Sequence, residues 1–168
     1  MANIKFSAFT SGATTGNTRI VGYDSTGNTN NQYTLAQLVD GMASSLTQNF
    51  IIACSDETTA LTTGTNKAVF RMPYAFTLTD ARASLTTAGS GIGGTTIDVN
   101  LNGSSIFDVS GLLTIDAGEK TSTTATVPVN ITTTALTDDG EITIDLDGIS
   151  AGAVETGLKV TLIGYKTP

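Results

Sequence analysis

The sequence predicts a mainly β fold: a jelly-roll-like antiparallel β-sandwich, preceded by an extended arm and one short α-helix. From about residue 56 to the end, apolar and polar residues alternate in short runs that Gly, Asn and Asp interrupt. Roughly eight or nine such runs fall within about 110 residues, a density typical of sandwich folds. Threonine is about one residue in five, and its branched Cβ suits a pleated strand. The chain contains no histidine, which removes the commonest general base and metal ligand.

Composition and charge exclude several classes of protein. Charged residues make up 14% of the 168 residues, apolar residues make up 39%, and the formal net charge is −7. This is the composition of a folded chain, and its negative charge would repel a nucleic-acid backbone. The first ten residues hold one Lys and no continuous apolar run. We therefore expect no signal peptide, no membrane insertion, and assembly in the cytoplasm of the cell that makes the protein.

Residues 1–33 form the first predicted segment, an extended arm. The segment is rich in Gly, Thr, Asn and Ser, which favour loops and extended chain over a packed core. The stretch Asp24–Gln32 has no apolar residue and is predicted to be a loop. Two short apolar clusters are expected to make brief β-contacts, and they consist of Ile4, Phe6 and Phe9, then Ile20, Val21 and Tyr23.

Residues 34–52 are predicted to be a helix and a linker. Thr34 and Gln37 have the spacing of a capping box, and Tyr33 and Leu38 occupy the N′ and N4 positions of a hydrophobic staple. The expected helix covers about residues 35–48, a length that is marginal in isolation. Its apolar stripe must pack on the sandwich or on copies of itself. The stripe consists of Leu35, Leu38, Val39, Met42 and Leu46.

Residues 53–168 are predicted to be the sandwich domain. Asn102-Gly103 lies between two alternating runs and has the chemistry of a type I′ hairpin turn, and Asp139-Gly140 and Asp147-Gly148 are further predicted turns. Pro128 indicates an edge strand or a bulge. The expected strands are 57–63, 67–72, 76–85, 95–102, 104–109, 111–115, 121–131, 141–147 and 157–166.

The residue types of an enzyme active site are missing from the sequence. Ser and Thr are plentiful, but without histidine, and with no Lys or Arg in an S-x-x-K arrangement, no activating base accompanies them. The single cysteine, Cys54, follows the apolar run 50–53 and is interpreted as a small buried thiol. We therefore expect a protein that is not an enzyme and that has no cofactor.

Two motif matches have simpler interpretations. Residues 89–94 satisfy G-x-G-x-x-G, but an alternating strand follows where a dinucleotide site needs a helix. Asp98, Asn100 and Asn102 match the first half of an EF-hand calcium loop. Val109 stands where that loop needs a bidentate Glu, so these residues are interpreted as the solvated face of a hairpin.

The densest acidic and aromatic stretches each leave an alternative open. Asp145 and Asp147 share a predicted strand face, interpreted as solvated, with a weak surface cation site as the alternative. Phe70, Tyr74 and Phe76 form the densest aromatic patch. We interpret this patch as core and inter-subunit packing, with a receptor contact as the alternative.

Three stretches of the sandwich region carry a resemblance to known proteins. They are ALTTGTNKAVFRMPYAFTL at 60–78, IDAGEKTS at 115–122 and GLKVTLIGY at 157–165. The region, about residues 56–167, resembles a β-sandwich module of bacteriophage virion proteins, especially those of marine and cyanobacterial phages. The resemblance implies a protein of the virion surface.

The amino-terminal pattern also resembles a phage module. It consists of IKFS at 4–7, IVGY at 20–23 and YTLAQL at 33–38, and it is similar to the short attachment module of phage fibre and decoration proteins. Such proteins are commonly homotrimers. The resemblance implies that the apolar residues of the arm dock on the particle, with the major capsid protein as the expected partner. A further hypothesis is that the apolar face of the helix lines the trimer axis.

Two placements on the virion stay open. Only the predicted helix separates the arm from the sandwich, whereas a tail fibre usually has a long shaft there. This favours a compact capsid decoration or cement protein, or a short head fibre. The alternatives are a tail-fibre or adhesin-type protein, attached to a tail protein and binding a host surface receptor or glycan, and a carbohydrate-binding module. The absence of Trp counts against the last of these.

Overall fold

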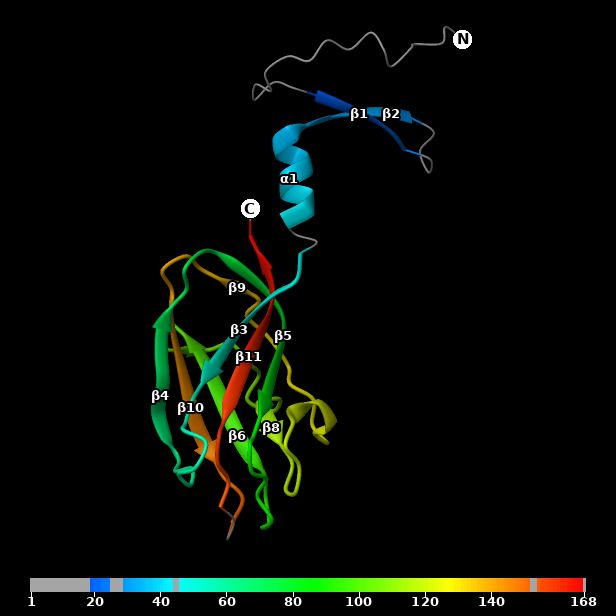
Figure 1. The fold of residues 1–168 in the computed structure, drawn as a ribbon. Helices are drawn as coiled ribbons and strands as arrows, with labels where there is room; N and C mark the ends of the chain where they lie inside the picture. The colour runs from blue at the N-terminus through cyan, green and yellow to red at the C-terminus, as the bar shows by residue number, and fades with distance from the viewer. Residues whose placement is uncertain (1–18, 25–28, 44–45, 152–153, 168) are drawn as a thin grey trace, which may run out of the picture. The chain divides into compact units, whose positions relative to one another are not determined.

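The computed structural model describes residues 19–24, 29–43, 46–151 and 154–167, and the side chains within these ranges from residue 31 onward except that of Ala43. The chain divides into two compact units, Met1–Met42 and Ala43–Pro168 (Figure 1).

The first unit contains a hairpin and a helix. Strands β1 (Arg19–Asp24) and β2 (Thr29–Thr34) pair antiparallel, with Arg19 opposite Thr34. Strand β2 continues directly into helix α1 (Leu35–Ala43). The prediction of a loop over Asp24–Gln32 is therefore wrong in its second half. Residues 29–32 are polar, yet their backbone pairs with β1, because a hairpin ladder needs main-chain groups rather than apolar side chains.

Helix α1 begins where the sequence predicts and ends earlier. The Thr34 N–H donates to Gln37 Oε1 at 2.8 Å and the Gln37 N–H donates to Thr34 Oγ1 at 3.1 Å, which confirms the capping box. The predicted end near residue 48 is wrong, because the helix stops at Ala43 and Leu46 lies in a bend. Residues from Gln48 onward form a strand instead, where sheet pairing outweighs a weak helical preference.

The second unit is built from two antiparallel sheets (Figure 1). One sheet has the order β3-β11-β5-β9, and the other has the order β4-β10-β6-β7, with β8 also paired to β6. The strands are β3 (Gln48–Ala53), β4 (Gly64–Arg71), β5 (Phe76–Ser84), β6 (Thr95–Leu101), β7 (Ser104–Ser105), β8 (Leu113–Ile115), β9 (Ala135–Leu136), β10 (Glu141–Gly148) and β11 (Lys159–Lys166).

The order of these strands is that of a jelly roll. Without the two-residue β7, the remaining strands β3 to β11 can be numbered one to eight along the chain. The sheets then run 1-8-3-6 and 2-7-4-5, the arrangement produced by two Greek keys. The mainly β, jelly-roll-like fold with one short α-helix is therefore confirmed.

The core lies between the two sheets and confirms the alternation in the sequence. Along β10, residues alternate between partly exposed and buried from Glu141 to Leu146. The same pattern holds along most of β6 and β11. The buried residues of these strands include Ile97, Val99, Ile142, Ile144, Leu146, Val160 and Leu162. One face of each strand is thus dry and the other is wet.

Two predicted strands are wrong. Residues 57–63 form an irregular loop, and residues 121–131 contain a 3-10 helix, Ser122–Thr124, capped by Thr121. Pro128 lies in this irregular region, in neither an edge strand nor a bulge. In both stretches Thr supplies strand propensity, but no continuous ladder forms. Residues 121–131 make only the isolated bridges Thr121–Ser84 and Ile131–Phe107, and propensity without a ladder does not make a strand.

The predicted turns have mixed outcomes. Asn102 and Gly103 both have positive φ, 50° and 82°, as a type I′ turn requires, and they join β6 to β7. The expected strand 104–109 is only the two residues of β7. The prediction of a turn at Asp147-Gly148 is wrong, because β10 continues through both residues and Gly148 pairs with Thr96 after a register shift.

Candidate functional site

The predicted assembly face lies on α1 and is exposed. Leu35, Val39 and Met42 are 42%, 55% and 64% exposed, and Leu38 is half-buried. Their spacing puts all four on one stripe of the helix. Leu46, the fifth predicted member of the face, lies beyond the end of the helix and is also exposed. The helix therefore presents an apolar surface that can receive a partner.

The side chains described in the first unit do not form a core. Every residue from Asn31 to Met42 is exposed or half-buried. A two-stranded hairpin and a nine-residue helix are each marginal without a hydrophobic face packed against something. The described residues of this unit therefore require stabilising contacts beyond those that they make with one another.

The described residues include only some of the predicted docking residues of the arm. Ile4, Phe6 and Phe9 lie outside the described residues. Ile20, Val21 and Tyr23 lie in β1, where Ile20 is opposite Tyr33 in the hairpin. The strand pairing agrees with a brief β-contact at this place, and the docking role stays a prediction.

Cys54 is a buried thiol at the end of β3. It is 8% exposed, and burial raises its pKa to about 11. At neutral pH the side chain is protonated and is a poor nucleophile. The interpretation of Cys54 as a small buried residue is confirmed.

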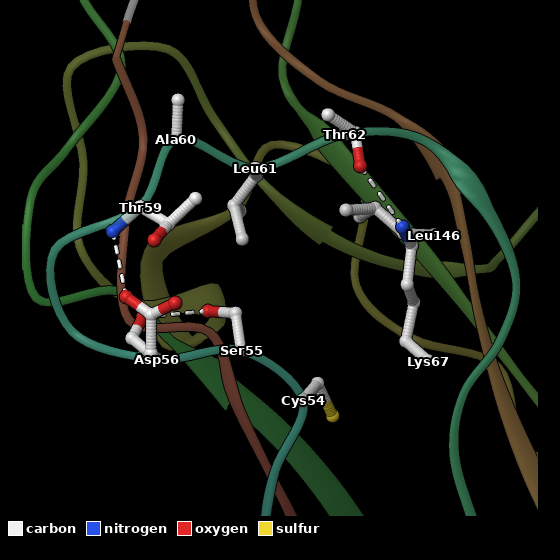
Figure 2. Close-up of a pocket in the computed structure, with 9 residues that line it drawn as sticks. All are labelled: Cys54, Ser55, Asp56, Thr59, Ala60, Leu61, Thr62, Lys67 and Leu146. Atoms are coloured by element: carbon white, nitrogen blue, oxygen red, sulfur yellow. Dashed lines mark hydrogen bonds between the residues drawn. The ribbon is translucent and has the colours of Figure 1, made fainter.

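A small pocket opens beside Cys54, between the loop after β3 and the start of β4 (Figure 2). Leu61 and Leu146 supply apolar lining, and the Lys67 ammonium donates to Thr62 Oγ1 at 3.1 Å. The pocket encloses about 170 Å³. Pockets for organic ligands usually enclose about 300–1,000 Å³, so this one suits water or a small ion.

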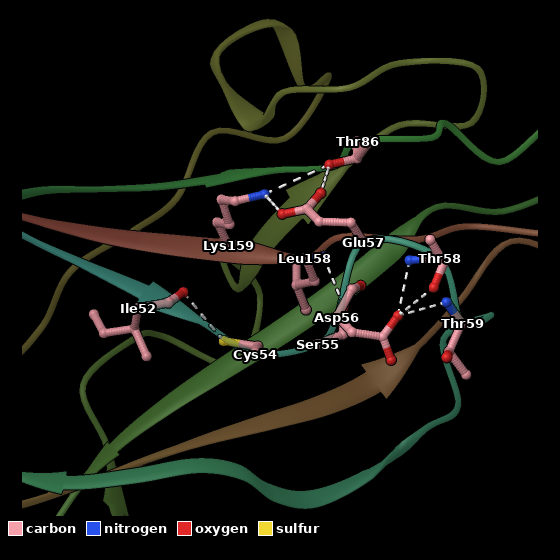
Figure 3. A network of polar contacts seen from close by, with 10 residues as sticks. All are labelled: Ile52, Cys54, Ser55, Asp56, Glu57, Thr58, Thr59, Thr86, Leu158 and Lys159. Carbon is pink, nitrogen blue, oxygen red and sulfur yellow. Dashed lines mark hydrogen bonds and ion pairs between the residues drawn. The ribbon is translucent and has the colours of Figure 1, made fainter.

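A polar network ties the loop after β3 to its neighbours (Figure 3). Asp56 Oδ1 accepts hydrogen bonds from the Thr59 N–H at 2.6 Å and the Thr58 N–H at 2.8 Å, and these bonds hold the pKa of Asp56 well below its usual range. Glu57 pairs with Lys159 and accepts from Thr86 Oγ1, so its pKa is also lowered. The Asp56 bonds fix the loop locally, and the Glu57 contacts connect it to segments distant in sequence, so both residues have a structural role.

One buried carboxylate was missed by sequence reasoning. Glu155 is 2% exposed and accepts hydrogen bonds from Thr95 Oγ1 at 2.7 Å and the Ser150 N–H at 3.2 Å. Gly89, from the G-x-G-x-x-G match, makes room for it, since a Cβ there would lie 2.2 Å from Glu155 Oε1. No local pattern marks Glu155, because an isolated Glu in a polar loop is normally solvated.

The acidic residues Asp98 and Asp145, on the outer face of β6 and β10, each accept a hydrogen bond from a neutral donor. Asp98 and Asp145 are opposite each other across the strands. Asp145 accepts from the Asn100 amide at 3.1 Å, and Asp98 accepts from Ser105 Oγ at 2.6 Å. Partial burial, with the charges of Asp98 and Asp145, raises the pKa of Asp147. Within the described ranges, no three His, Cys, Asp or Glu side chains group so as to hold a metal ion.

The predicted aromatic patch divides between core and edge. Phe76 is fully buried, whereas Phe70 and Tyr74 are half-buried and pack against the core from its side. The Phe50 ring lies 5.2 Å from that of Phe76 and 5.9 Å from that of Tyr74. The Tyr74 hydroxyl donates to Gln48 Oε1 at 2.7 Å. The half-buried rings thus belong to the margin of the core.

Comparisons of the chain with protein-family models, curated proteins and solved structures found no match. None of the helical segments in the described ranges has the length and apolar character needed to span a bilayer.

Proposed function

We propose that the chain is a non-enzymatic structural protein of a bacteriophage virion. It is a homotrimeric capsid decoration or cement protein that docks on the major capsid protein through its amino-terminal arm and carries the β-sandwich on the virion surface. The observation that carries this proposal is the exposed apolar face of α1, in a unit whose described side chains include no buried residue.

The spacing of this face supports self-association through α1. Leu35, Leu38 and Met42 fit successive a, d and a positions of a heptad, and Val39 lies beside them at e. Three parallel helices with this pattern bury their a and d residues in a shared core. Trimer formation would therefore give the first unit a core that its described side chains do not form within one copy.

The sandwich supports the same proposal by analogy of fold. Jelly rolls occur in viral capsid proteins, and also in lectins and cupins. The resemblance of residues 56–167 to a phage virion module favours the viral group. The small volume of the pocket near Cys54 favours a structural role over the binding of an organic substrate.

The trimer is tested by placing charge on the apolar face of α1. The double substitution Leu38→Asp and Met42→Asp should convert trimers into monomers, because three copies would bring six carboxylates into the helix core. Mass is measured by light scattering after size exclusion. Ala36→Asp, at heptad position b and outside the a and d positions, is the control and should remain trimeric. Trimers that persist in the double variant would sink the proposal that α1 drives assembly.

The placement on the virion is tested by cryo-EM of particles that carry the protein. Trimers at many positions over the shell are expected of a decoration protein. A few copies at the tail vertex would contradict the capsid placement and favour the tail-fibre or adhesin alternative. In the capsid case, removal of residues 1–33 should abolish binding to particles that lack the protein.

A further inference from the structure

The sandwich has two long strand edges without a partner among the described residues. Strand β3 pairs only with β11, and strand β4 pairs only with β10. Figure 1 shows that the two strands border the same side of the sandwich and run in opposite directions. We name this the β3/β4 side. The remaining edge strands are short: β9 and β7 have two residues each and β8 has three.

The hydrogen-bond register identifies which main-chain groups of β3 face outward. The Cys54 N–H donates to the Leu158 carbonyl at 2.8 Å, so Phe50 and Ile52 bond to β11 by the alternation of an antiparallel ladder. The N–H and C=O groups of the residues between them point to the open edge. These residues are Asn49, Ile51 and Ala53.

Strand β4 also has main-chain groups that face outward. The Met72 N–H donates to the Gly140 carbonyl at 2.9 Å, so Phe70 bonds to β10 and the main-chain groups of Val69 and Arg71 face outward. The side chains of Ile51 and Val69 are 67% and 54% exposed. Each edge thus offers hydrogen-bonding groups beside an exposed apolar side chain.

Strand β3 lacks the features that normally keep an edge from pairing. Its sequence, QNFIIA, has no charge and no proline, and its register with β11 has no bulge. Natural sheets protect their edges with charges, prolines, bulges or very short strands. Strand β4 is protected in this way, by Lys67, Arg71 and a register shift near Asp145. An unprotected edge in a folded protein indicates that the edge is covered when the protein is assembled.

Charge favours a second copy of this chain as the cover for β3. Each copy has a formal charge of −7, so copies repel unless they meet at neutral surfaces. Strand β3 is uncharged, and so are two of its outward-facing neighbours on β11, Thr161 and Ile163. The third, Lys159 opposite Ala53, is paired with Glu57. Pairing of β4 with β4 of a second copy would place Lys67 and Arg71 of one copy near those of the other. Pairing of β3 with β4 avoids this repulsion, because β3 is uncharged.

We propose that β3 of one copy pairs antiparallel with β4 of the next copy, so that the sandwiches form a closed ring. The proposal rests on the homotrimer proposed above. A rotation axis parallel to the strands places β3 of one copy beside the oppositely directed β4 of its neighbour, and head-to-tail contacts of this kind close into rings. The pairing also covers the half-buried rings of Phe50, Phe70 and Tyr74.

The short connection between α1 and β3 favours this pairing. Only residues 44–47 separate the end of α1 from Gln48 in the chain. Copies joined through α1 therefore hold their β3 edges at a high effective concentration, so a weak edge contact is sufficient to form the ring.

Amide hydrogen exchange of the full-length protein tests the pairing. In the monomeric variant Leu38→Asp/Met42→Asp, the amides of Phe50 and Ile52 should be protected by β11 while those of Ile51 and Ala53 exchange rapidly. In the wild-type trimer, the amides of Ile51, Ala53, Val69 and Arg71 should exchange about tenfold or more slowly than in the monomer. Protection of β3 without protection of β4 would overturn the head-to-tail pairing.

A surface substitution provides an independent test. Ile51→Lys should raise the dissociation constant of the trimer about tenfold or more while leaving the thermal unfolding of the monomeric double variant unchanged, because Ile51 is exposed there. Val109→Lys is the matched control, since Val109 is 90% exposed in a loop outside the β3/β4 side, and it should leave the trimer intact.

Failure of this inference can be distinguished from failure of the proposed function. A wild-type trimer whose Ile51 and Val69 amides stay unprotected would overturn the ring and leave trimerisation through α1 standing. A wild-type protein that is monomeric at all concentrations would overturn both.

Discussion

At the scale of single residues, Asp56 organises the loop that follows β3. Its Oδ1 accepts two backbone N–H groups and the Thr58 hydroxyl, so the three residues after it are held in one conformation. Sequence reasoning assigned a strand to this segment. The carboxylate decides otherwise, because a local side-chain acceptor satisfies backbone donors that a strand would offer to a neighbour.

The lowered pKa of Asp56 gives its contribution to stability a defined pH dependence. Because the folded-state pKa lies below the unfolded value of about 3.9, the stabilisation is fully present above about pH 4 and is lost as the pH falls through the folded-state pKa. Asp56→Asn should therefore lower the melting temperature at pH 7, and its difference from wild type should shrink in strong acid. Thermal unfolding followed by circular dichroism at pH 7 and pH 2 measures this.

Asp138→Asn is the control for loss of one surface charge near neutral pH. Asp138 is exposed, so this substitution should change the melting temperature at pH 7 less than Asp56→Asn does. An equal difference between wild type and Asp56→Asn at both pH values would show that the ionised form of Asp56 is not what stabilises the loop.

At the scale of elements, the turn of the β6–β7 hairpin requires particular residues at Asn102 and Gly103. Gly103 has φ of 82°, and a Cβ placed there would meet no atom within 4 Å. A side chain at position 103 would therefore cause no steric clash, and its free-energy cost would come only from the strained backbone conformation. This hairpin also positions Asn102, whose Oδ1 accepts from the Glu141 N–H at 2.9 Å and links the turn to β10.

Substitution of this glycine isolates the conformational cost. Gly103→Ala should reduce the free energy of unfolding by about 1–2 kcal/mol, since an L-residue is strained in the left-handed region. Urea denaturation of the monomeric double variant measures the change. Ser104→Ala, at the exposed neighbouring position, should cost under about 0.5 kcal/mol. A loss for Gly103→Ala no larger than this would contradict the argument.

At the scale of the whole molecule, the two units differ in how they are stabilised. The buried hydrophobic residues of the described chain all lie between Cys54 and Leu162, within the second unit. That unit contains a complete jelly roll with its own core. The described side chains of the first unit, residues 31–42, form no such core, which is the basis for assigning this unit to assembly.

This difference predicts the behaviour of a truncated chain. Residues 46–168 alone should unfold cooperatively, with a melting temperature within about 4 °C of that of the monomeric double variant, because the core is retained. They should also be monomeric at micromolar concentration, since α1 is absent. Calorimetry and light scattering measure both properties. Non-cooperative melting of the fragment would show that the first unit contributes to the stability of the sandwich.

Several features followed from the sequence because their causes are local. The alternation around Ile97, Ile142 and Leu158 predicted strands with one buried face. The capping box at Thr34 predicted the start of α1, and Asn102-Gly103 predicted a hairpin turn. The apolar stripe of α1, the main part of the candidate site, followed from helical spacing alone. Each of these depends on residues within a few positions of one another.

Only the tertiary structure decided the features that depend on distant partners. Strand β3 exists because Ile52 pairs with Val160, more than 100 positions away, and this pairing also shortened the predicted helix. Glu155 is buried because Thr95 and Ser150 donate to it inside the fold. The two open edges are likewise a property of strand order. Local sequence sets the preference of each segment, but the fold determines which neighbour satisfies its backbone and which edge is left without one.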